Sequence, residues 1–272
     1  MPNQEHIQLG DVQETLLLPL WGRAVETQKG HPLLIDNTAV NIINSIDYNF
    51  SHIAKNMNEL SRLAWIARSL YFDCKIRDFL VKNPNSTVIN VGCGFDTTFD
   101  RTDNGQVEWY DLDVEAVINL RKKFIKETPR RTFLPYSVFD TNWYQNIKNK
   151  ENVLIMMAGV IYYFTEIEVK SLFQDFNSHF QKCEAIFDYS SPLGVKVANK
   201  KVIDDGGMDK SAYLSWGVKN INDIYKWDLQ ISILDNRPMF KGFKSKLDFQ
   251  SKIGTWISDK LAIMSLAHIK LS

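Results

Sequence analysis

The stretch Val88-Ile-Asn-Val-Gly-Cys-Gly-Phe-Asp-Thr97 decides the fold class of this sequence. It begins as a β-rich run and ends in Gly92-x-Gly94, a spacing typical of a strand whose carboxyl end lets the backbone pass close to a ligand. A full dinucleotide-binding motif would have a third glycine at position 97, so Thr97 disfavours a pyrophosphate on a helix N-terminus. The pattern predicts a ligand crevice, with an ordinary tight turn as the alternative.

The next predicted strand ends in two acids. Asp111 and Asp113 lie 17 and 19 residues after Gly94, close to the ~20 residues expected for a carboxylate that binds ribose hydroxyls. Asp113 could instead cap the helix that begins at Val114, an alternative that Asp111 lacks. A third strand tip carries Asp140, which could accept from an adenine amino group or simply start a turn.

Around this motif the chain divides into two regions. From Thr87 onward, short β-rich runs alternate with amphipathic helices, a pattern typical of βαβ units and a parallel sheet. Thr165 and Glu168 form a capping box at the start of one such helix. We expect an α/β fold in which residues 86–272 form a Rossmann-like core and residues 1–85, where no strand-like run occurs, form a helical cap.

Composition excludes several classes of protein. The 272 residues are 44% hydrophobic and 24% charged, which is typical of a globular chain rather than a disordered or fibrous one. Basic and acidic residues number 32 each and the formal net charge is zero. No overall field therefore attracts nucleic acid or an anionic membrane, and we expect neither partner.

Cysteine use and the N-terminus predict a cytoplasmic protein. The three cysteines include no CxxC pair, so they indicate neither a disulfide framework nor a zinc site, and no metal is expected. The N-terminus is polar and acidic rather than basic and apolar as in a signal peptide. The longest apolar run, Val153–Phe164, is shorter than the ~20 residues of a membrane-spanning helix.

Arg68 lies within an apolar stripe of a long predicted helix, Met57–Leu80. Helical spacing places it with Trp65 and Phe72, where burial is expected. A buried guanidinium needs an anion, which a neighbour such as Asp73 or a ligand carboxylate could supply. The alternative is an arginine that extends along the edge of the stripe to solvent.

Together, several stretches resemble one family, the leucine carboxyl methyltransferases, in its bacterial branch similar to tetracenomycin-type polyketide O-methyltransferases. The resemblance covers about residues 15–190 and rests on TLLLPLWGRAVE, DNTAVNIINSIDYNF, Arg68 before YFD, VINVGCGFDTTFDR, VEWYDLDVEAVINLRKKF, SVFDTNW and AGVIYYFTEIEVKSLF. It implies a class I S-adenosylmethionine-dependent fold: a seven-stranded, mostly parallel sheet with an antiparallel last strand, extra N-terminal helices, and a lid inserted at about residues 192–227.

The resemblance also implies roles for individual residues. Its cofactor-binding positions are Arg68 for the methionine carboxylate, Gly92 and Gly94 for the methionine moiety, Asp113 with Asp111 for the ribose, Asp140 with Thr141 for the adenine, and Ala158. Arg23 matches a basic position that the family places close to the substrate. We assign Arg23 and Tyr162 to catalysis.

The acceptor is expected to be a small molecule or a peptide. Ala158 stands where many members of the family have a Glu, which disfavours a protein C-terminal leucine as the substrate. No His or Lys occupies a matched catalytic position, so an already ionised carboxylate is favoured, held by Arg23 or a lid lysine. The alternatives are a phenol or hydroxyl acceptor, a degenerate S-adenosylmethionine-binding protein, and a nicotinamide oxidoreductase, which Thr97 and Arg68 disfavour. The sequence does not indicate an oligomeric state.

The irregular segment Pro192–Trp227 is expected to close over the acceptor as a mobile lid. Gly206-Gly207 would be its hinge, and the apolar groups that would close are Met208, Tyr213, Leu214 and Trp216. On this hypothesis Trp216 affects use of the acceptor more than binding of the cofactor. The alternative is a surface subdomain whose aromatic residues pack on the core.

Overall fold

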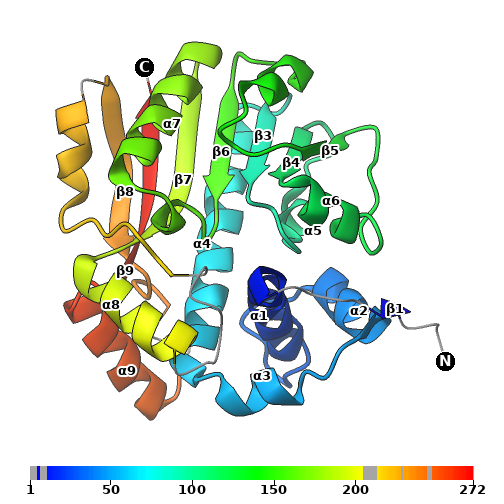
Figure 1. Cartoon of the computed structure of the whole chain (residues 1–272), viewed down its shortest axis with the longest axis vertical. Helices are drawn as coiled ribbons and strands as arrows, with labels where there is room; N and C mark the ends of the chain where they lie inside the picture. Colours follow the sequence, from blue (N-terminus) through cyan, green and yellow to red (C-terminus); the bar gives the residue numbers. More distant parts are fainter. Residues whose placement is uncertain (1–4, 7–10, 205–212, 228, 244–246, 272) are drawn as a thin grey trace.

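A computed structural model of the chain describes residues 5–6, 11–204, 213–227, 229–243 and 247–271. A seven-stranded sheet with the order β5-β4-β3-β6-β7-β9-β8 forms its centre (Figure 1). The strands are β3 (Thr87–Val91), β4 (Glu108–Asp113), β5 (Arg131–Pro135), β6 (Val153–Met157), β7 (Cys183–Ser190), β8 (Ile231–Pro238) and β9 (Met264–Leu271). Only β9 runs against its neighbours, so the expected mostly parallel sheet with an antiparallel last strand is confirmed.

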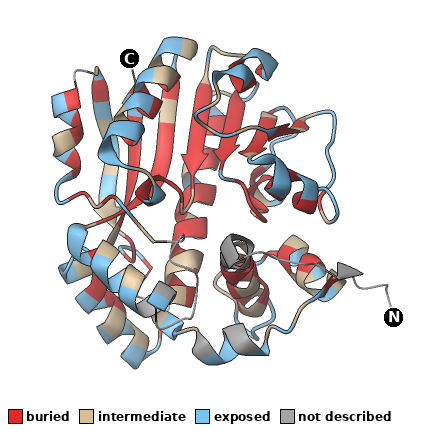
Figure 2. Ribbon diagram, viewed as in Figure 1, coloured by how far each residue is buried: buried red, intermediate tan, exposed pale blue. Residues whose placement is uncertain are grey.

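Helices cover both faces of the sheet and surround its carboxyl edge. They are α1 (Asp11–Thr27), α2 (Asn37–Ser45), α3 (Ser51–Asn56), α4 (Glu59–Lys82), α5 (Thr98–Thr102), α6 (Glu115–Arg121), α7 (Glu166–His179), α8 (Pro192–Ala198) and α9 (Phe249–Lys260). The side chains of α4 pack on one face of the sheet and those of α7 on the other. Because both faces are covered, β3 and β6 are buried along their whole length (Figure 2). Every residue of β6 is apolar, whereas β3 also buries Thr87 and Asn90.

The N-terminal helices position the ligand-binding edge. Leu17 and Leu20 of α1 pack with Cys93 and Phe95, which follow β3, in one apolar cluster. Asp36 caps α2 by accepting from the Ala39 N–H at 2.9 Å. This cluster brings α1 against the turn after β3, which the sequence had singled out.

Some boundaries differ from the sequence-based expectation. Residues 1–85 do contain strand, because β1 (Glu5–His6) pairs in parallel with β2 (Ile46–Asp47). The helix expected to begin at Val114 is the short α6, which ends at Arg121. Beyond it the N–H groups of Lys123 and Phe124 bond three residues back, so the helix tightens into turns. Helix α9 begins at Phe249, with Asp248 as its N-cap. The capping box of α7 is present as predicted.

Within the described ranges, no helix is both long enough and apolar enough to cross a membrane.

Candidate functional site

A cavity of about 860 Å³ lies at the carboxyl edge of the sheet. Its walls come from α1 and α4, from the turns that follow β3, β4, β5 and β6, and from segments near residues 190–198 and 258–264. Parallel strands present their carboxyl ends at one edge, so chain segments far apart in sequence meet there. A cavity of this size is in the range of small-molecule and cofactor sites.

Gly92 and Gly94 line the cavity, and a side chain at either position would clash with a neighbour. Both have left-handed backbone, with φ of +63° and +41°. A Cβ at Gly92 would lie 2.6 Å from Cγ2 of Val160, and one at Gly94 would lie 2.9 Å from Cδ2 of Leu16. The two glycines therefore let the turn after β3 pack closely between α1 and the turn after β6. Both predicted residues line the cavity.

Asp113, at the end of β4, also lines the cavity. Its two carboxylate oxygens accept from the Gly94 N–H at 2.9 Å and from the Val114 N–H at 2.8 Å. It does not cap α6, whose N-cap is Val114. Burial raises the pKa of the Asp113 carboxyl, although these two backbone hydrogen bonds oppose the rise. A carboxylate held in this way can accept further hydrogen bonds from a ligand in the cavity.

Asp111, by contrast, does not line the cavity in the described part of the chain. It is fully buried and accepts from Arg121 at 2.9 Å and Arg131 at 2.7 Å, and also from Asn90 and Trp109. Burial disfavours its charge, but the two arginines outweigh burial and hold the pKa of Asp111 below its usual value. Of the two predicted acids, Asp113 is the one that faces the cavity, and Asp111 anchors the sheet edge.

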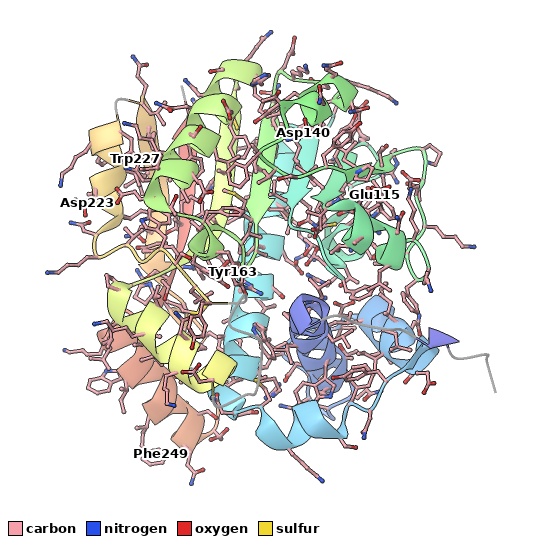
Figure 3. The ribbon with its side chains drawn as sticks, viewed as in Figure 1. Glu115, Asp140, Tyr163, Asp223, Trp227 and Phe249 are labelled. Carbon is pink, nitrogen blue, oxygen red and sulfur yellow. The ribbon has the colours of Figure 1, made fainter. Side chains whose placement is uncertain are left out.

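The segment after β5, where Asp140 was the predicted ligand contact, lines the cavity through other residues than expected. Asp140 caps the short 3₁₀ helix Thr141–Asn146 by accepting from the Asn142 N–H at 2.9 Å. Neither Asp140 nor Thr141 is among the described residues that line the cavity, whereas residues 136–139 are. In Figure 3, Asp140 lies away from Tyr163, which is near the centre of the view. The structure therefore favours the turn-forming alternative for Asp140.

Arg68 is buried, as the stripe predicted, and it lines the cavity. Its Nη1 donates to Asp188 Oδ2 at 2.9 Å, and Asp188 Oδ1 accepts from the Gly159 N–H at 2.6 Å. Burial alone would lower the pKa of Arg68, but Asp188 and Tyr162 raise it, so the guanidinium keeps its charge. The protein itself supplies the required anion. Asp188 could have been suspected from the sequence, as an acid within the apolar run of β7.

Arg23 has protein partners too. Its Nε donates to Asp36 at 2.8 Å and its Nη2 to the Phe95 carbonyl at 3.0 Å. Asp36 also accepts from Arg101 at 2.8 Å and from Thr97 at 2.5 Å, and these groups hold the pKa of Asp36 low against the effect of its burial. Arg23 thus joins α1 to α2 and to the turn after β3, at the wall of the cavity.

Ala158 and Tyr162, which follow β6, both line the cavity. The backbone carbonyl of Tyr162 accepts from the Ser215 N–H at 2.7 Å and the Trp216 N–H at 3.1 Å. Burial, followed by the charge of Asp188, raises the pKa of Tyr162 well above its usual value. Its hydroxyl is therefore a hydrogen-bonding group beside Arg68 rather than a base.

The half of the cavity opposite the glycine turn carries no charge among its described residues. The charged lining residues are Arg23, Arg68, Asp96 and Asp113, and they belong to α1, α4, the turn after β3 and the end of β4. We call the opposite half the uncharged lining that comes from α8, α9 and the segments next to them, which lie on the other side of α4 from α5 and α6 (Figure 1), together with Leu60. Its residues are Leu60, Ser190, Gly194, Val197, Ala198, Leu214, Met239, Phe240, Ser258, Ile263 and Met264. It suits a largely apolar ligand. Within the described ranges, no cluster of His, Cys, Asp or Glu is arranged to hold a metal ion.

The proposed lid segment contributes only some of its predicted residues. Leu214 lines the cavity, whereas Trp216 belongs to the core cluster of the sheet, 5.8 Å from the ring of Trp227. Trp216 therefore packs on the core, as in the alternative of a surface subdomain whose aromatic residues pack there. Tyr213 donates to Asp204, and Gly206, Gly207 and Met208 lie outside the described residues.

Comparisons with known proteins agree with this architecture. The model of the leucine carboxyl methyltransferase family matches residues 17–177. The tetracenomycin polyketide synthesis O-methyltransferase of Streptomyces glaucescens is 29% identical over 218 residues, which are 79% of this chain and 78% of that protein.

Solved structures are similar in fold at low sequence identity. A DUF574 family protein from Streptomyces avermitilis has a TM-score of 0.62 at 8% identity, covering 96% of this chain and 99% of that one. The plantazolicin methyltransferase BamL, solved with a desmethyl-plantazolicin analogue and SAH, has a TM-score of 0.51 at 11% identity, covering 96% and 97%.

Proposed function

This chain belongs to the leucine carboxyl methyltransferase family and is an S-adenosylmethionine-dependent methyltransferase; from that premise we propose that it methylates a carboxylate oxygen of a small, largely apolar molecule. The observation that carries the proposal is the chemistry of the half of the cavity opposite the glycine turn. Its described residues supply neither a base nor a charge.

The residues of the glycine half fit the cofactor. The proposed contacts are Arg68 with the methionine carboxylate, Gly92 and Gly94 with the methionine chain, and Asp113 with the ribose hydroxyls. The uncharged stretch 136–139 takes the place of Asp140 and Thr141 beside the adenine. When bound, the cofactor supplies a methyl group on a positively charged sulfur.

Arg68 suits a carboxylate because it is buried, charged and at the cavity wall, and because its Nη1 is the atom that donates to Asp188. A guanidinium presents several donors in a fixed plane, so one cation can hold two carboxylates. Asp188 orients Arg68 and is itself held by the Gly159 N–H. This arrangement fixes the guanidinium before any ligand arrives, which reduces the entropy lost on binding.

Methyl transfer needs a nucleophilic oxygen in line with the bond that breaks. A carboxylate is already ionised near neutral pH, whereas a phenol with a pKa near 10 must lose a proton. Burial raises the pKa of Tyr162 and Tyr163, so neither hydroxyl becomes an anion that could take that proton. The new bond joins the carboxylate oxygen to the methyl carbon as the carbon–sulfur bond breaks, and the bonding pair stays on sulfur.

An apolar setting favours this reaction because the anion and the cation neutralise each other as the bond forms. Charges interact more strongly where water is excluded, and closure around the acceptor removes its hydration. Alignment of the two reactants supplies much of the remaining rate. In this proposal Tyr162 lies beside the reacting groups and positions the acceptor oxygen by hydrogen bonding, and Arg23 supports the wall.

The test is the chemical nature of the product. The protein is incubated with S-adenosylmethionine and a panel of aromatic and aliphatic acids, phenols and short peptides, and methylated products are detected by mass. A carboxylate acceptor yields a methyl ester, which releases methanol in mild alkali, whereas an aryl methyl ether does not. An alkali-stable product would assign the enzyme to hydroxyl methylation, and cofactor binding without turnover on any acceptor would favour a degenerate binding protein.

A further inference from the structure

In helix α9 the polar face is buried and the apolar face is exposed, which is the reverse of a helix packed on a protein core. All of α9 lies in the described range 247–271, and its buried residues are Thr255 and Ser258. Large apolar side chains point outward instead: Phe249 is 77% exposed, Trp256 55%, Ile253 46% and Ile257 45%. In α7, by contrast, the buried residues are Val169, Leu172, Phe173 and Phe176. The folding of this chain does not account for the outer face of α9.

The exposed residues form one continuous stripe. Positions 249, 253, 256 and 257 follow the i, i+4, i+7, i+8 spacing of a single helix face. Figure 3 shows Phe249 at the outer edge of the molecule. Helix α8 extends the surface, because Leu193 is also exposed. The two helices meet where Ser190 and Ser191 bond the Ile263 carbonyl, just after α9.

Positive charge accompanies this stripe. Lys252 and Lys260 lie on the same face of α9, and the ammonium of Lys260 is 5.8 Å from the centre of the Trp256 ring. The two acids of this region are turned to other partners: Asp248 caps the helix by accepting from Ser251, and Asp259 accepts from the Phe240 N–H. These two acids keep their charges, so what the stripe itself presents is the ammonium group of Lys260 against Trp256, with Lys252 beside the stripe.

We propose that the outer face of α8 and α9 docks on the surface of an anionic lipid bilayer. Exposed Phe and Trp with aliphatic residues and lysines on one short helix are the features of a helix that lies in the interface of a membrane. Self-association is disfavoured, because two copies meeting on this face would oppose their lysines. The expectation of no membrane partner rested on the net charge, which does not describe a local patch.

The docking face lies next to the cavity, so docking would bring the cavity close to molecules dissolved in the lipid. Ser258 of α9 and Val197 of α8 line the cavity, while Trp256 and Ile257 of α9 are exposed on the outer side. One layer of helix therefore separates the apolar half of the cavity from the docking face. An apolar acceptor dissolved in lipid could reach the cavity beside α8, a step that rests on the proposed function, although docking itself does not.

The test is sedimentation of the full chain with vesicles. Wild-type protein is expected to sediment with vesicles of phosphatidylcholine mixed with phosphatidylglycerol, and less with phosphatidylcholine alone. Phe249→Ser/Trp256→Ser should lower partitioning about tenfold or more through lost apolar burial. Lys252→Gln/Lys260→Gln should lower it about fivefold per lysine on the anionic vesicles, with little effect on neutral ones.

The matched control is Val81→Ser/Ile167→Ser, which removes two side chains that are 83% and 81% exposed on α4 and α7, and it should bind vesicles as the wild type does. All variants should keep the wild-type melting temperature and cofactor affinity, which separates this proposal from the proposed function. Trp256→Phe should keep vesicle binding but lose part of the quenching of tryptophan fluorescence by brominated lipid. Wild-type protein that stays in the supernatant, or a dimer that Phe249→Ser/Trp256→Ser dissociates, would overturn the proposal.

Discussion

The buried pair of Arg68 and Asp188 shows how one residue can serve both the fold and a ligand. Asp188 neutralises the guanidinium whether or not a ligand is bound, so burial of Arg68 does not by itself prove ligand binding. Its place at the cavity wall beside Tyr162 and Gly159 is the feature that points to a ligand. The two roles can be separated by experiment.

Arg68→Ala is expected to weaken S-adenosylmethionine binding by about 1.5–3 kcal/mol, the range for a hydrogen bond to a charged group. The loss should shrink for an analogue that lacks the methionine carboxylate, as a double-mutant comparison requires. Calorimetry with both ligands measures this. Arg77→Ala, on the exposed side of the same helix, is the control and should leave both affinities unchanged. Equal losses for both ligands would mark Arg68 as purely structural.

The two acids of β4 are expected to respond differently to the same change. Asp113→Asn should weaken cofactor binding by about 1–3 kcal/mol with little change in melting temperature, because Asp113 faces the cavity. Asp111→Asn should instead lower stability by about 3–5 kcal/mol, because Arg121 and Arg131 lose their buried counter-ion. Calorimetry and thermal unfolding on both variants test the assignment, and the reverse pattern would exchange the two roles.

Among the larger elements, the turn after β3 depends on its glycines. Gly92→Ala and Gly105→Ala both place a side chain on left-handed backbone, at a cost of about 1–2 kcal/mol. Only Gly92 adds a clash, since its Cβ would meet Val160, whereas nothing lies within 4 Å at Gly105. Gly92→Ala should therefore lower stability more and weaken cofactor binding at least tenfold. Gly105→Ala should leave the cofactor Kd at its wild-type value, and similar behaviour of the two variants would contradict this account.

The segment 213–227 combines a cavity wall with core packing. Trp216→Ala should lower stability by about 3–5 kcal/mol, because it empties a core site. Leu214→Ala should raise the acceptor KM or lower kcat and leave the cofactor Kd within about twofold, a change under ~0.5 kcal/mol. Steady-state kinetics and thermal unfolding distinguish the two. A Leu214→Ala variant with unchanged kinetics would remove this segment from acceptor recognition.

Over the whole molecule, buried carboxylates tie the N-terminal helices and the sheet together and make stability depend on pH. The pKa values of Asp36 and Asp111 are lowered in the folded state by their arginine partners, against the effect of burial. A lowered folded-state pKa adds stability above the unfolded-state value and loses it as pH falls. Asp113 has the opposite sign, because burial raises its pKa.

The free energy of unfolding is therefore expected to decrease as pH falls below about 4, the ordinary pKa of Asp. Urea unfolding across a series of pH values measures this. Asp111→Asn should show a shallower decrease than the wild type, because it removes one of the groups that must take up a proton. A variant curve parallel to that of the wild type would show that Asp111 does not contribute.

Much of the fold could be predicted from the sequence because its signals are local. The apolar run of β3, the Gly92-x-Gly94 turn and the capping box at Thr165 each depend on residues within a few positions of one another. The alternation of such elements restricts the topology to a covered parallel sheet. The boundaries of α6 and α9 were less predictable, because helix ends depend on tertiary packing as well as on the residues at the ends.

The sequence by itself determined that this chain forms an α/β sheet with a ligand-binding turn after β3, since backbone preference and apolar periodicity act over short distances. Only the tertiary structure decided which polar residues face the cavity. Asp188 lies 120 positions from Arg68, and Asp36 lies 65 from Arg101. A buried charge takes whichever counter-charge the fold brings within reach, so the pairing of Arg23, Arg68 and Asp111 depended on contacts that no local pattern records.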